Sequence, residues 1–345
     1  MTTRMAGPDT NVDVVVPLFR PGPWLRVSLD SIRAQRKVSS RVWLIDDDPT
    51  SDIGAAIAAE WPDFTYIKSS QNFGFARACN RGLAFGSAPF VLVVNQDTRL
   101  EPDYTAHATR ALLEDPSLGA VGGLLLRQND AESPPDGTID TAGIAFRRGR
   151  RAVDVGQGDV DTGQYAGRRE VFGVCAAAAV YRRSALMEVA DSNGVFDERF
   201  FMHKEDVDLA WRLRRAGYRA VVHDEARGYH ARGVRRATDV TGSGARAAWQ
   251  RVVAVIRQET AKDPSLRQRA FRNHVLMLIK NESLRDLSRS FWDIVAVLTV
   301  QTLIAVALDP VGTMPGRVEL LMRLPHALQS RRRRPVVTDL RHWLP

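Results

Sequence analysis

Cysteine is scarce in this sequence, which contains two, Cys79 and Cys175, among 345 residues. Both lie in apolar or helical stretches without paired spacing, so we expect neither a disulfide framework nor a zinc site. The first residues, MTTRMAGPDTN, include no apolar h-region, so we do not expect a secretory signal. These features favour a reducing, cytoplasmic setting.

Lysine is scarce as well, because only five of the 48 lysine and arginine residues are lysine. An arginine bias beside abundant alanine is typical of GC-rich coding, so part of the net charge of +8 is compositional. A basic chain can still meet an anionic partner, such as nucleic acid, an acidic membrane surface or a phosphorylated substrate. The hydrophobic content of 44% supports one large α/β domain with an appendage, or two modest domains.

Two familiar phosphate-binding motifs are missing from the sequence. No GxGxxG follows the first apolar run, and no GxxxxGK[ST] occurs. A backbone cradle for a dinucleotide or a triphosphate is therefore not expected. A diphosphate can instead be held by a divalent metal ion bound to carboxylates, with an arginine that helps to balance the charge.

Short apolar runs alternate with helical patterns over the first half of the chain. The expected strands are residues 13–17, 41–46, 64–69, 90–95 and 119–126. This alternation predicts the α/β class, with a mostly parallel sheet covered by helices. Residues 127–170 are rich in Gly, Asp and Arg and predict an inserted hairpin or a mobile loop. From about residue 243 the pattern is helical.

Polar residues follow each of the first four expected strands, at the edge where parallel sheets collect ligands. These segments read PLFRPG, DDDPTSD, SSQNFGFARACN and NQDT. Asp97, at the end of the fourth, and His230 could supply the protein ligands of a metal ion. The alternative for His230 is an ordinary, partly buried histidine.

The stretch from Phe200 to His230, FFMHKEDVDLAWRLRRAGYRAVVHDEARGYH, places acids at the start of an amphipathic helix. Acids in a first helical turn complement the helix dipole, and Gly217 is a natural stop after a basic last turn. A helix with this pattern requires no function. The acids alone therefore leave a structural role and a catalytic role equally open.

The C-terminal part contains an apolar segment, residues 294–308, which is shorter than the roughly 20 residues that span a bilayer. A second amphipathic piece, GRVELLMRLPHALQSRRRRP, follows and ends in four arginines, Arg331 to Arg334. A buried core helix is one interpretation of the apolar segment. The combination of apolar faces and a basic cluster favours a helix lying on an anionic cytoplasmic leaflet, over a core helix or a true span.

Seven stretches, taken together and in order, resemble family 2 glycosyltransferases of the GT-A fold, nearest to the bacterial rhamnosyltransferase-like branch. They are VVVPLFRPGPWLRVSLDSI, LIDDDPTSD, NFGFARACNRGL, FVLVVNQDT, FGVCAAAAVYRRSAL, FDERFFMHKEDVDLAWRLRRAGYRAVVHDEARGYH and RNHVLMLIKNES. The resemblance covers about residues 12–281. It implies the GT-A nucleotide-diphospho-sugar transferase fold, an α/β fold with a mostly parallel central sheet and a helical C-terminal region.

The resemblance also implies a division of the chain. Residues 1–242 would form the catalytic domain, with a nucleotide-sugar half at about 12–126 and an acceptor and catalytic half at about 127–242. Residues 243–345 would form a helical region with an amphipathic, basic, membrane-associating tail.

Site residues can be assigned by their match to the family's motifs. Asp206 matches the catalytic base. Asp97 matches the ligand of a Mg²⁺ or Mn²⁺ ion that bridges the diphosphate, and His230 the histidine that completes metal coordination in some members. Residues implied to contact the nucleotide sugar are Pro17, Asp46, Asn72, Arg77 and Asn95. Glu205 and Asp208 would orient the helix start and the acceptor.

Three positions depart from the family's pattern. The metal motif reads NQD instead of Asp-any-Asp, so that Asn95 offers a neutral oxygen. DDDPTSD replaces the more usual Asp-Asn pair, which leaves the roles of Asp47 and Asp48 open. His203 stands where an aromatic residue is more common.

The sequence thus predicts an inverting, metal-dependent glycosyltransferase of the hexosyltransferase class. It would move a sugar, for which the branch suggests rhamnose, from a dTDP-, UDP- or GDP-linked donor to a lipid-linked glycan or polysaccharide in cell-envelope synthesis. An inverting transfer needs one carboxylate to take the acceptor proton and a cation to stabilise the leaving diphosphate. The expected location is cytoplasmic, peripherally associated with the inner face of the membrane.

Two other interpretations remain in view. A catalytically degenerate GT-A scaffold is suggested by the NQD motif. A nucleic-acid-binding protein is suggested by basicity alone, but the arginines are dispersed and the acid clusters would repel phosphates, so no nucleic-acid partner is expected.

Overall fold

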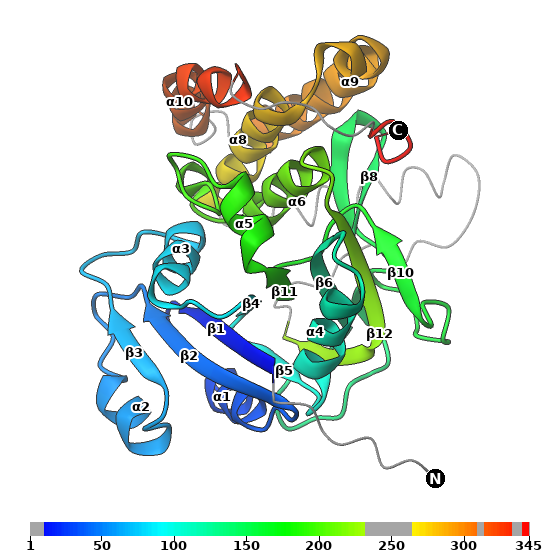
Figure 1. The fold of residues 1–345 in the computed structure, drawn as a ribbon. Coiled ribbons are helices and arrows are strands. Elements are labelled where there is room, and N and C mark those ends of the chain that lie inside the picture. The colour runs from blue at the N-terminus through cyan, green and yellow to red at the C-terminus, as the bar shows by residue number, and fades with distance from the viewer. Residues whose placement is uncertain (1–9, 232–263, 309–313, 333–339, 345) are drawn as a thin grey trace.

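A computed structural model describes residues 10–231, 264–308, 314–332 and 340–344, and its centre is a ten-stranded sheet (Figure 1). The strands of this sheet are β1 (Thr10–Leu18), β2 (Val38–Asp46), β3 (Thr65–Lys68), β4 (Phe90–Val94), β5 (Thr98–Leu100), β6 (Leu118–Arg127), β7 (Ile139–Thr141), β10 (Arg168–Val171), β11 (Ala178–Arg182) and β12 (Arg219–His230). The strand order is β10-β12-β6-β11-β4-β1-β2-β3, with β5 beside β12 and β7 beside β6.

The five strands expected from the sequence are β1, β2, β3, β4 and β6. The first four pair in parallel, β4 with β1, β1 with β2, and β2 with β3. β6 and β12 are also parallel, while β11 runs antiparallel to β4 and β6 and joins the two parallel sets. The predicted α/β class is therefore confirmed, as a mixed, mostly parallel central sheet with helices.

Helices cover both faces of the sheet (Figure 1). One face carries α1 (Trp24–Arg33), α2 (Gly54–Glu60) and α4 (Tyr104–Glu114), and the other carries α3 (Phe75–Phe85), α5 (Arg183–Val189) and α6 (Glu205–Arg215). β1 shows the reason, because successive strand side chains point to opposite faces. Val14 and Val16 pack with the first group of helices, and Val15 packs with the second.

The region 127–170 contains a hairpin, one of the two structures expected there. Strands β8 (Ile144–Arg147) and β9 (Arg151–Asp154) are joined by the 3-10 turn η1 (Arg148–Arg150). In this turn Arg150 is buried, and its Nε donates to Glu282 Oε2 at 2.9 Å. The hairpin is therefore fixed to the C-terminal part of the chain.

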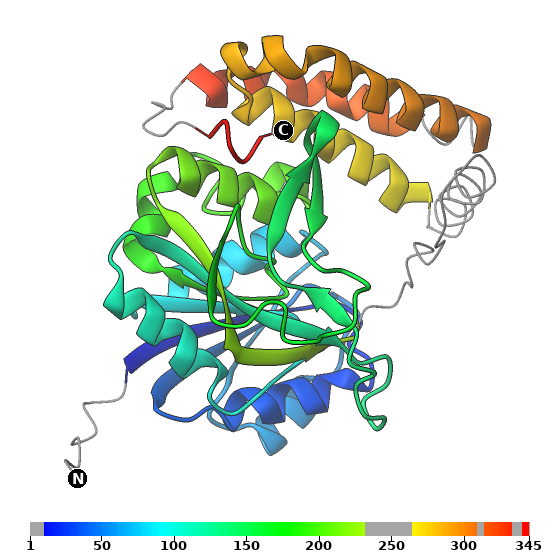
Figure 2. The same cartoon turned by 90° about the vertical axis from the view of Figure 1, so that its right-hand side faces the viewer.

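The C-terminal part is helical, as expected, and comprises α8 (Pro264–Asn281), α9 (Leu284–Leu308) and α10 (Met314–Arg332). Figure 2 shows these three helices as a layer at one end of the molecule, beyond α6 and the β8–β9 hairpin. The short turn η2 (Glu198–Phe200) precedes α6. The boundary proposed between residues 242 and 243 lies outside the described residues.

α9 is not a core helix. The stretch Arg285–Ala307 is long and apolar enough to cross a membrane by length and composition, yet only 11% of it is buried. Trp292 is 78% exposed and Leu303 is 63% exposed. The buried-core interpretation of this segment is therefore wrong.

Buried charges join α8 to α6 and to the residue that precedes η2. Lys280 Nζ forms ion pairs with Asp197 and, at 2.8 Å, with Asp208 Oδ1. Asn281 Nδ2 also donates to Asp208 Oδ1 at 2.8 Å, and Arg212 Nε donates to Asp208 Oδ2 at 2.8 Å. All five side chains are buried, so α6 and α8 depend on each other for charge neutralisation.

Lys280→Met is expected to reduce the free energy of unfolding by about 3–5 kcal/mol, because it removes the buried cation that Asp197 and Asp208 share and leaves each carboxylate paired with its arginine. Burial alone would raise the pKa of Asp197, but hydrogen bonds from Arg199 and the charge of Lys280 hold it below its ordinary value. Because this folded-state pKa is depressed, the stabilisation is present above about pH 4 and is lost as the pH falls through the folded pKa. Urea unfolding at pH 7 and at lower pH measures both effects.

The control is Lys37→Met, which removes an exposed ion pair with Asp103, where Nζ lies 3.2 Å from Oδ1 and the lysine side chain is 72% exposed. Such pairs contribute about 0–1 kcal/mol. Equal, small losses in the two variants would contradict a stabilising role for Lys280.

Candidate active site

Asp97 and His230 lie together because β5 and β12 pair. Thr98 stands opposite His230 in this antiparallel pair, and Ala231 N donates to Asp97 O at 3.0 Å. Asp97 Oδ1 lies 3.4 Å from His230 Nε2, and Asn95 Nδ2 lies 3.5 Å from the same nitrogen. The two metal-ligand candidates and Asn95 are thus grouped at the end of β4.

Asp140, which the sequence analysis missed, orients His230. It lies in β7 and is fully buried, with Oδ2 2.9 Å from His230 Nδ1. When Nδ1 donates its proton to Asp140, Nε2 is left facing Asp97, an arrangement that commonly supports a metal-binding histidine. The signal was a single aspartate within the short run TIDTAG, inside a segment expected to be a hairpin or loop.

The charge state of His230 follows from these neighbours. Burial lowers the pKa of His230, but hydrogen bonds with Asp140 and Asp97 outweigh burial and raise it to about 9. The imidazole is therefore protonated at neutral pH, and a cation that binds Nε2 must displace a proton.

The residues of this group fit a divalent cation. Asn95 Oδ1 is buried, and within the described part of the chain no hydrogen bond reaches it. A buried oxygen of this kind is unusual, and a carboxylate and an imidazole lie beside it. Mg²⁺ and Mn²⁺ take oxygen ligands, and imidazole is a common further ligand of transition-metal ions. The residues able to hold the ion are Asn95, Asp97 and His230.

Asp206 is connected to this group through two consecutive residues. Ala177 O accepts hydrogen bonds from Asn95 N at 3.0 Å and from Thr98 Oγ1 at 3.1 Å. The backbone amide of Ala176, the preceding residue, hydrogen-bonds the carboxylate of Asp206. The metal motif NQD and Asp206, at the start of α6, are therefore both hydrogen-bonded to the segment formed by Ala176 and Ala177.

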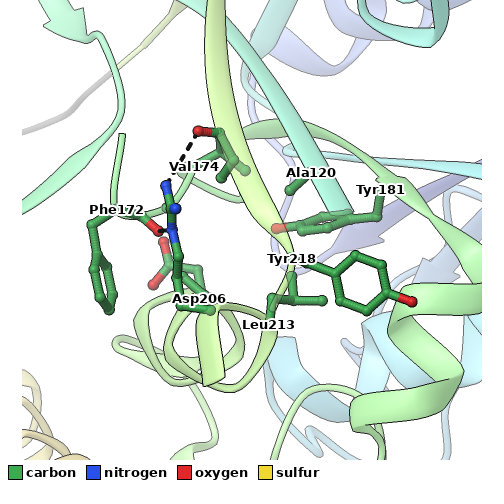
Figure 3. A pocket seen from close by; sticks show the side chains of 11 residues that line it. Ala120, Phe172, Val174, Tyr181, Asp206, Leu213 and Tyr218 are labelled. Atoms are coloured by element: carbon green, nitrogen blue, oxygen red, sulfur yellow. Dashed lines mark hydrogen bonds between the residues drawn. The ribbon is translucent and has the colours of Figure 1, made fainter. Parts of the chain in front are cut away.

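Asp206 also lines a small cavity with Phe172, Tyr181 and Tyr218 (Figure 3). Its volume of about 10 Å³ has room for about one water molecule. Burial raises the pKa of the half-buried Asp206 carboxyl, against the opposing charge of Lys204. A raised pKa makes this carboxylate a stronger base, as general-base catalysis near neutral pH requires.

Glu205 and Asp208 are both buried. Burial and the charge of Asp206 raise the pKa of Glu205 to about 8, which favours the protonated form of this carboxyl near neutral pH. Asp208 is bound by Arg212, Lys280 and Asn281, as described above. Both acids therefore contact the protein interior at the start of α6.

Pro17 and Asp46 are close because β1 and β2 pair in register, with Leu18 opposite Asp46. Asp46 is fully buried and accepts hydrogen bonds from Tyr66 Oη at 2.6 Å and Asp48 N at 3.0 Å. Burial and the hydrogen bond to Asp46 raise the pKa of Tyr66 to about 12, so the phenol stays a donor. The carboxylate of Asp46 is thereby held in one orientation.

Asp47 and Asp48, whose roles the sequence left open, hold backbone segments. Asp47 Oδ2 accepts from Phe73 N at 2.7 Å and from Gly74 N at 2.6 Å, which fixes the loop after β3. Asp48 Oδ1 accepts from Thr50 N at 2.9 Å and closes the turn after β2. Their hydrogen bonds are therefore with the protein's own loops.

Asn72 lies on the loop that Asp47 fixes, and Arg77 lies in the first turn of α3, which follows this loop. Asn72 is exposed, and its Oδ1 accepts from Gly74 N at 3.0 Å. Arg77 is exposed, with its guanidinium carbon 4.0 Å from the centre of the Phe73 ring and its Nε 3.6 Å from Glu198 Oε2. The Arg77 guanidinium is therefore an accessible cation near the carboxyl end of β3.

Comparison with known proteins gives a family for this arrangement. The profile described as Glycosyl transferase family 2 matches residues 13–190, more than half of the chain. A crystal structure of GalNAc-T7 with UDP, GalNAc and Mn²⁺ has a similar fold, with a TM-score of 0.54 over 79% of this chain and 48% of that one. At 12% identity this likeness concerns the fold alone, and it agrees with the predicted GT-A fold.

Two curated relatives are bacterial. The O-antigen biosynthesis protein RfbC of Myxococcus xanthus is 27% identical over 237 residues, 66% of this chain and 18% of the relative. The N-acetylglucosaminyl-diphospho-decaprenol L-rhamnosyltransferase of Mycobacterium tuberculosis is 28% identical over 240 residues, 63% of this chain and 75% of the relative. The chain thus spans less than a fifth of the first relative and three quarters of the second. It belongs to glycosyl transferase family 2, a family of glycosyltransferase enzymes, and resembles the rhamnosyltransferase-like members of that family.

Proposed function

We propose that the protein is an inverting, metal-dependent glycosyltransferase that moves a rhamnosyl residue from a nucleotide-diphospho-sugar to a lipid-linked or polysaccharide acceptor. The observation that carries this proposal is the connection of Asp206, through Ala176 and Ala177, to the group formed by Asn95, Asp97 and His230. In an inverting transfer, one carboxylate takes the acceptor proton on the face opposite the leaving diphosphate. Asp206, with its raised pKa, is the proposed base.

The donor would lie across the carboxyl ends of β1 to β4. Pro17 and Asp46, which are both buried, would hold the base and ribose from beneath. Asn72 and Arg77 would lie along the nucleotide, where the exposed guanidinium offers positive charge. A Mg²⁺ or Mn²⁺ ion held by Asn95, Asp97 and His230 would neutralise the charge of the departing diphosphate.

The remaining acidic residues would hold other groups of the site in place. Asp140 would hold the His230 ring with Nε2 toward the diphosphate. Glu205, whose raised pKa favours its protonated form, and the fully paired Asp208 would fix the start of α6 and so orient the acceptor beside Asp206.

The proposed sugar and acceptor are supported by the named activity of the mycobacterial relative, a rhamnosyltransferase acting on a lipid-diphosphate-linked sugar. The experiment is a donor panel, in which release of dTDP, UDP or GDP is measured with a polyprenyl-diphospho-sugar acceptor, with and without Mn²⁺ or Mg²⁺. We expect metal-dependent nucleotide release from the rhamnosyl donor. Nucleotide release from a different donor would show that the proposed sugar is wrong. Release from none of the donors would favour a catalytically degenerate GT-A scaffold.

We further propose that the enzyme works at the cytoplasmic face of the membrane, with α9 lying on the lipid surface. Trp292, Val295, Leu303 and Val306 are exposed at helical spacing and share one side of α9. In α10, Leu321 and Met322 are also exposed. Further along the sequence is the arginine cluster Arg331 to Arg334. Its last two residues, Arg333 and Arg334, fall outside the described residues. An apolar face beside basic residues suits an anionic leaflet.

Trp292→Glu combined with Leu303→Glu is expected to reduce cosedimentation with anionic vesicles by at least about tenfold. The reason is that burying one large apolar side chain contributes roughly 1.5–3 kcal/mol, and both substitutions also add negative charge. Leu113→Glu, on the 58% exposed side chain of Leu113 in α4, is the control and should bind as wild type does. Unchanged sedimentation of the double variant would contradict contact through α9.

A further inference from the structure

The loop that leads into α6 has a strained backbone. Phe201, His203 and Lys204 have positive φ angles, of 65°, 70° and 75°. Such a conformation costs a residue other than glycine about 1–3 kcal/mol and persists only where the surroundings enforce it. Lys204 directly precedes Glu205 and Asp206, so the shape of this loop determines where the proposed base lies.

The enforcing contacts come from α8. Asn273 is fully buried, and its Nδ2 donates to the carbonyl oxygens of Phe200, Met202 and His203 at 2.9, 2.8 and 2.7 Å. Three carbonyls of one short loop therefore converge on a single amide group. Arg272 Nε donates to Asn273 Oδ1 at 2.9 Å, which fixes the orientation of the amide with its N–H groups toward the loop.

The other side of the loop rests on α3, at the nucleotide end of the sheet. Ala76 N, in the first turn of α3, donates to Phe201 O at 3.1 Å. A Cβ at Gly74 would lie 2.5 Å from the Phe201 ring, so only glycine permits this close approach. The loop is therefore held between α3 and α8.

We propose that Asn273 is a positioning residue for sugar transfer, which fixes the Asp206 carboxylate through the loop 200–204. This proposal rests on the function proposed for Asp206. The position requires an amide, because only Asn combines two N–H donors for the carbonyls with an oxygen for Arg272 at this side-chain length. The substitution Asn273→Asp would turn a carboxylate oxygen toward three carbonyl oxygens. Asn273→Ala would remove the donor that the three carbonyls share, although Arg272 Nη2 would still donate to Phe200 O at 3.1 Å.

The first test compares Asn273→Ala and Asn273→Asp with wild type in kcat, donor KM and melting temperature. We expect kcat to fall by about 10²-fold, as for a displacement of a catalytic group by about 1 Å, while the donor KM stays within about threefold. Gln268→Ala is the control on the same helix, because Gln268 lies against Gly316 of α10, and its kcat should match wild type. A lower melting temperature with unchanged kcat would overturn the proposal.

The second test is a double-mutant cycle with Asp206→Asn. If Asn273 acts through Asp206, Asn273→Ala should cost less than about threefold in kcat once the base is gone. An equal loss in both backgrounds would overturn the proposal. Full transfer by Asp206→Asn alone would overturn the base assignment instead, so the two proposals fail in different measurements. If Asn273→Ala does not fold, adding His203→Gly relieves one residue with a positive φ and allows the same cycle.

Discussion

Asp206→Asn is expected to lower the rate of sugar transfer by about 10²- to 10⁴-fold while leaving a folded protein that still binds the nucleotide. The substitution preserves the size of the side chain and removes the proton acceptor. The nucleotide would still be held by Asp46, Arg77 and the metal ligands. A transfer assay at saturating donor, with nucleotide affinity from calorimetry, separates the loss of chemistry from a loss of binding.

The control for this prediction is Asp286→Asn. Asp286 lies in the first turn of α9 and exchanges hydrogen bonds with Ser283, which makes it an acid whose contacts suit helix capping. Its replacement should cost about 0.3–1 kcal/mol of stability and leave transfer to a soluble acceptor unchanged. Asp208 is unsuitable as a control because its carboxylate is buried against Lys280 and Arg212. Near-normal transfer by the Asp206 variant would contradict the base assignment and leave Asp206 with only a helix-dipole role.

Asp97→Ala is expected to abolish metal-dependent turnover, and His230→Ala to weaken it less. Asp97 supplies the carboxylate of the proposed site, whereas an ion that keeps diphosphate and water ligands can lose one imidazole. Because the pKa of His230 is raised to about 9, a proton competes with the metal, and Mn²⁺ affinity should increase as the pH rises toward 9. Mn²⁺ titrations at several pH values measure both effects, and the His230 variant should lose the pH dependence.

A second group of possible ligands provides the control for the metal experiment. His107, His223 and Glu225 have ligand atoms within 4.8 Å of one another, between α4 and β12. Metal bound there should have no effect on transfer, so His107→Ala should retain the full Mn²⁺ dependence of wild type. Full wild-type activity in excess chelator would remove the metal role from both Asp97 and His230.

The strand ends of the site could be predicted from the sequence, because apolar periodicity locates strands and parallel strands deliver their following residues to one edge. The partnership of Asp97 and His230 depends on the pairing of β5 with β12, more than a hundred residues apart. Periodicity carries no information on that register. The two residues were paired in the sequence analysis because of their ligand chemistry and, after that, because of the family resemblance. Asp140 was missed because a strand of three residues leaves almost no periodic signal.

The contacts of α8 were also beyond the sequence. An amphipathic pattern tells which side of a helix is apolar, but here three polar residues, Asn273, Lys280 and Asn281, are buried together with the apolar residues of α8. Their partners lie about seventy residues or more earlier in the chain. α9 illustrates the same limit, since an apolar helix in a core and one on a surface differ only in what packs against them.

The packing of α8 also sets the distance between the proposed base, Asp206, and α10. On one side α8 binds the loop before Asp206, and on the other it packs on α10, where Arg272 pairs with Glu319 and Gln268 meets Gly316. If α9 and α10 rest on lipid, the height of the base above the bilayer is fixed by this rigid spacer. A lipid-anchored glycan presents its hydroxyls at heights set by the number of its sugars. Under these conditions the enzyme would favour acceptors whose terminal hydroxyl reaches Asp206 at that height.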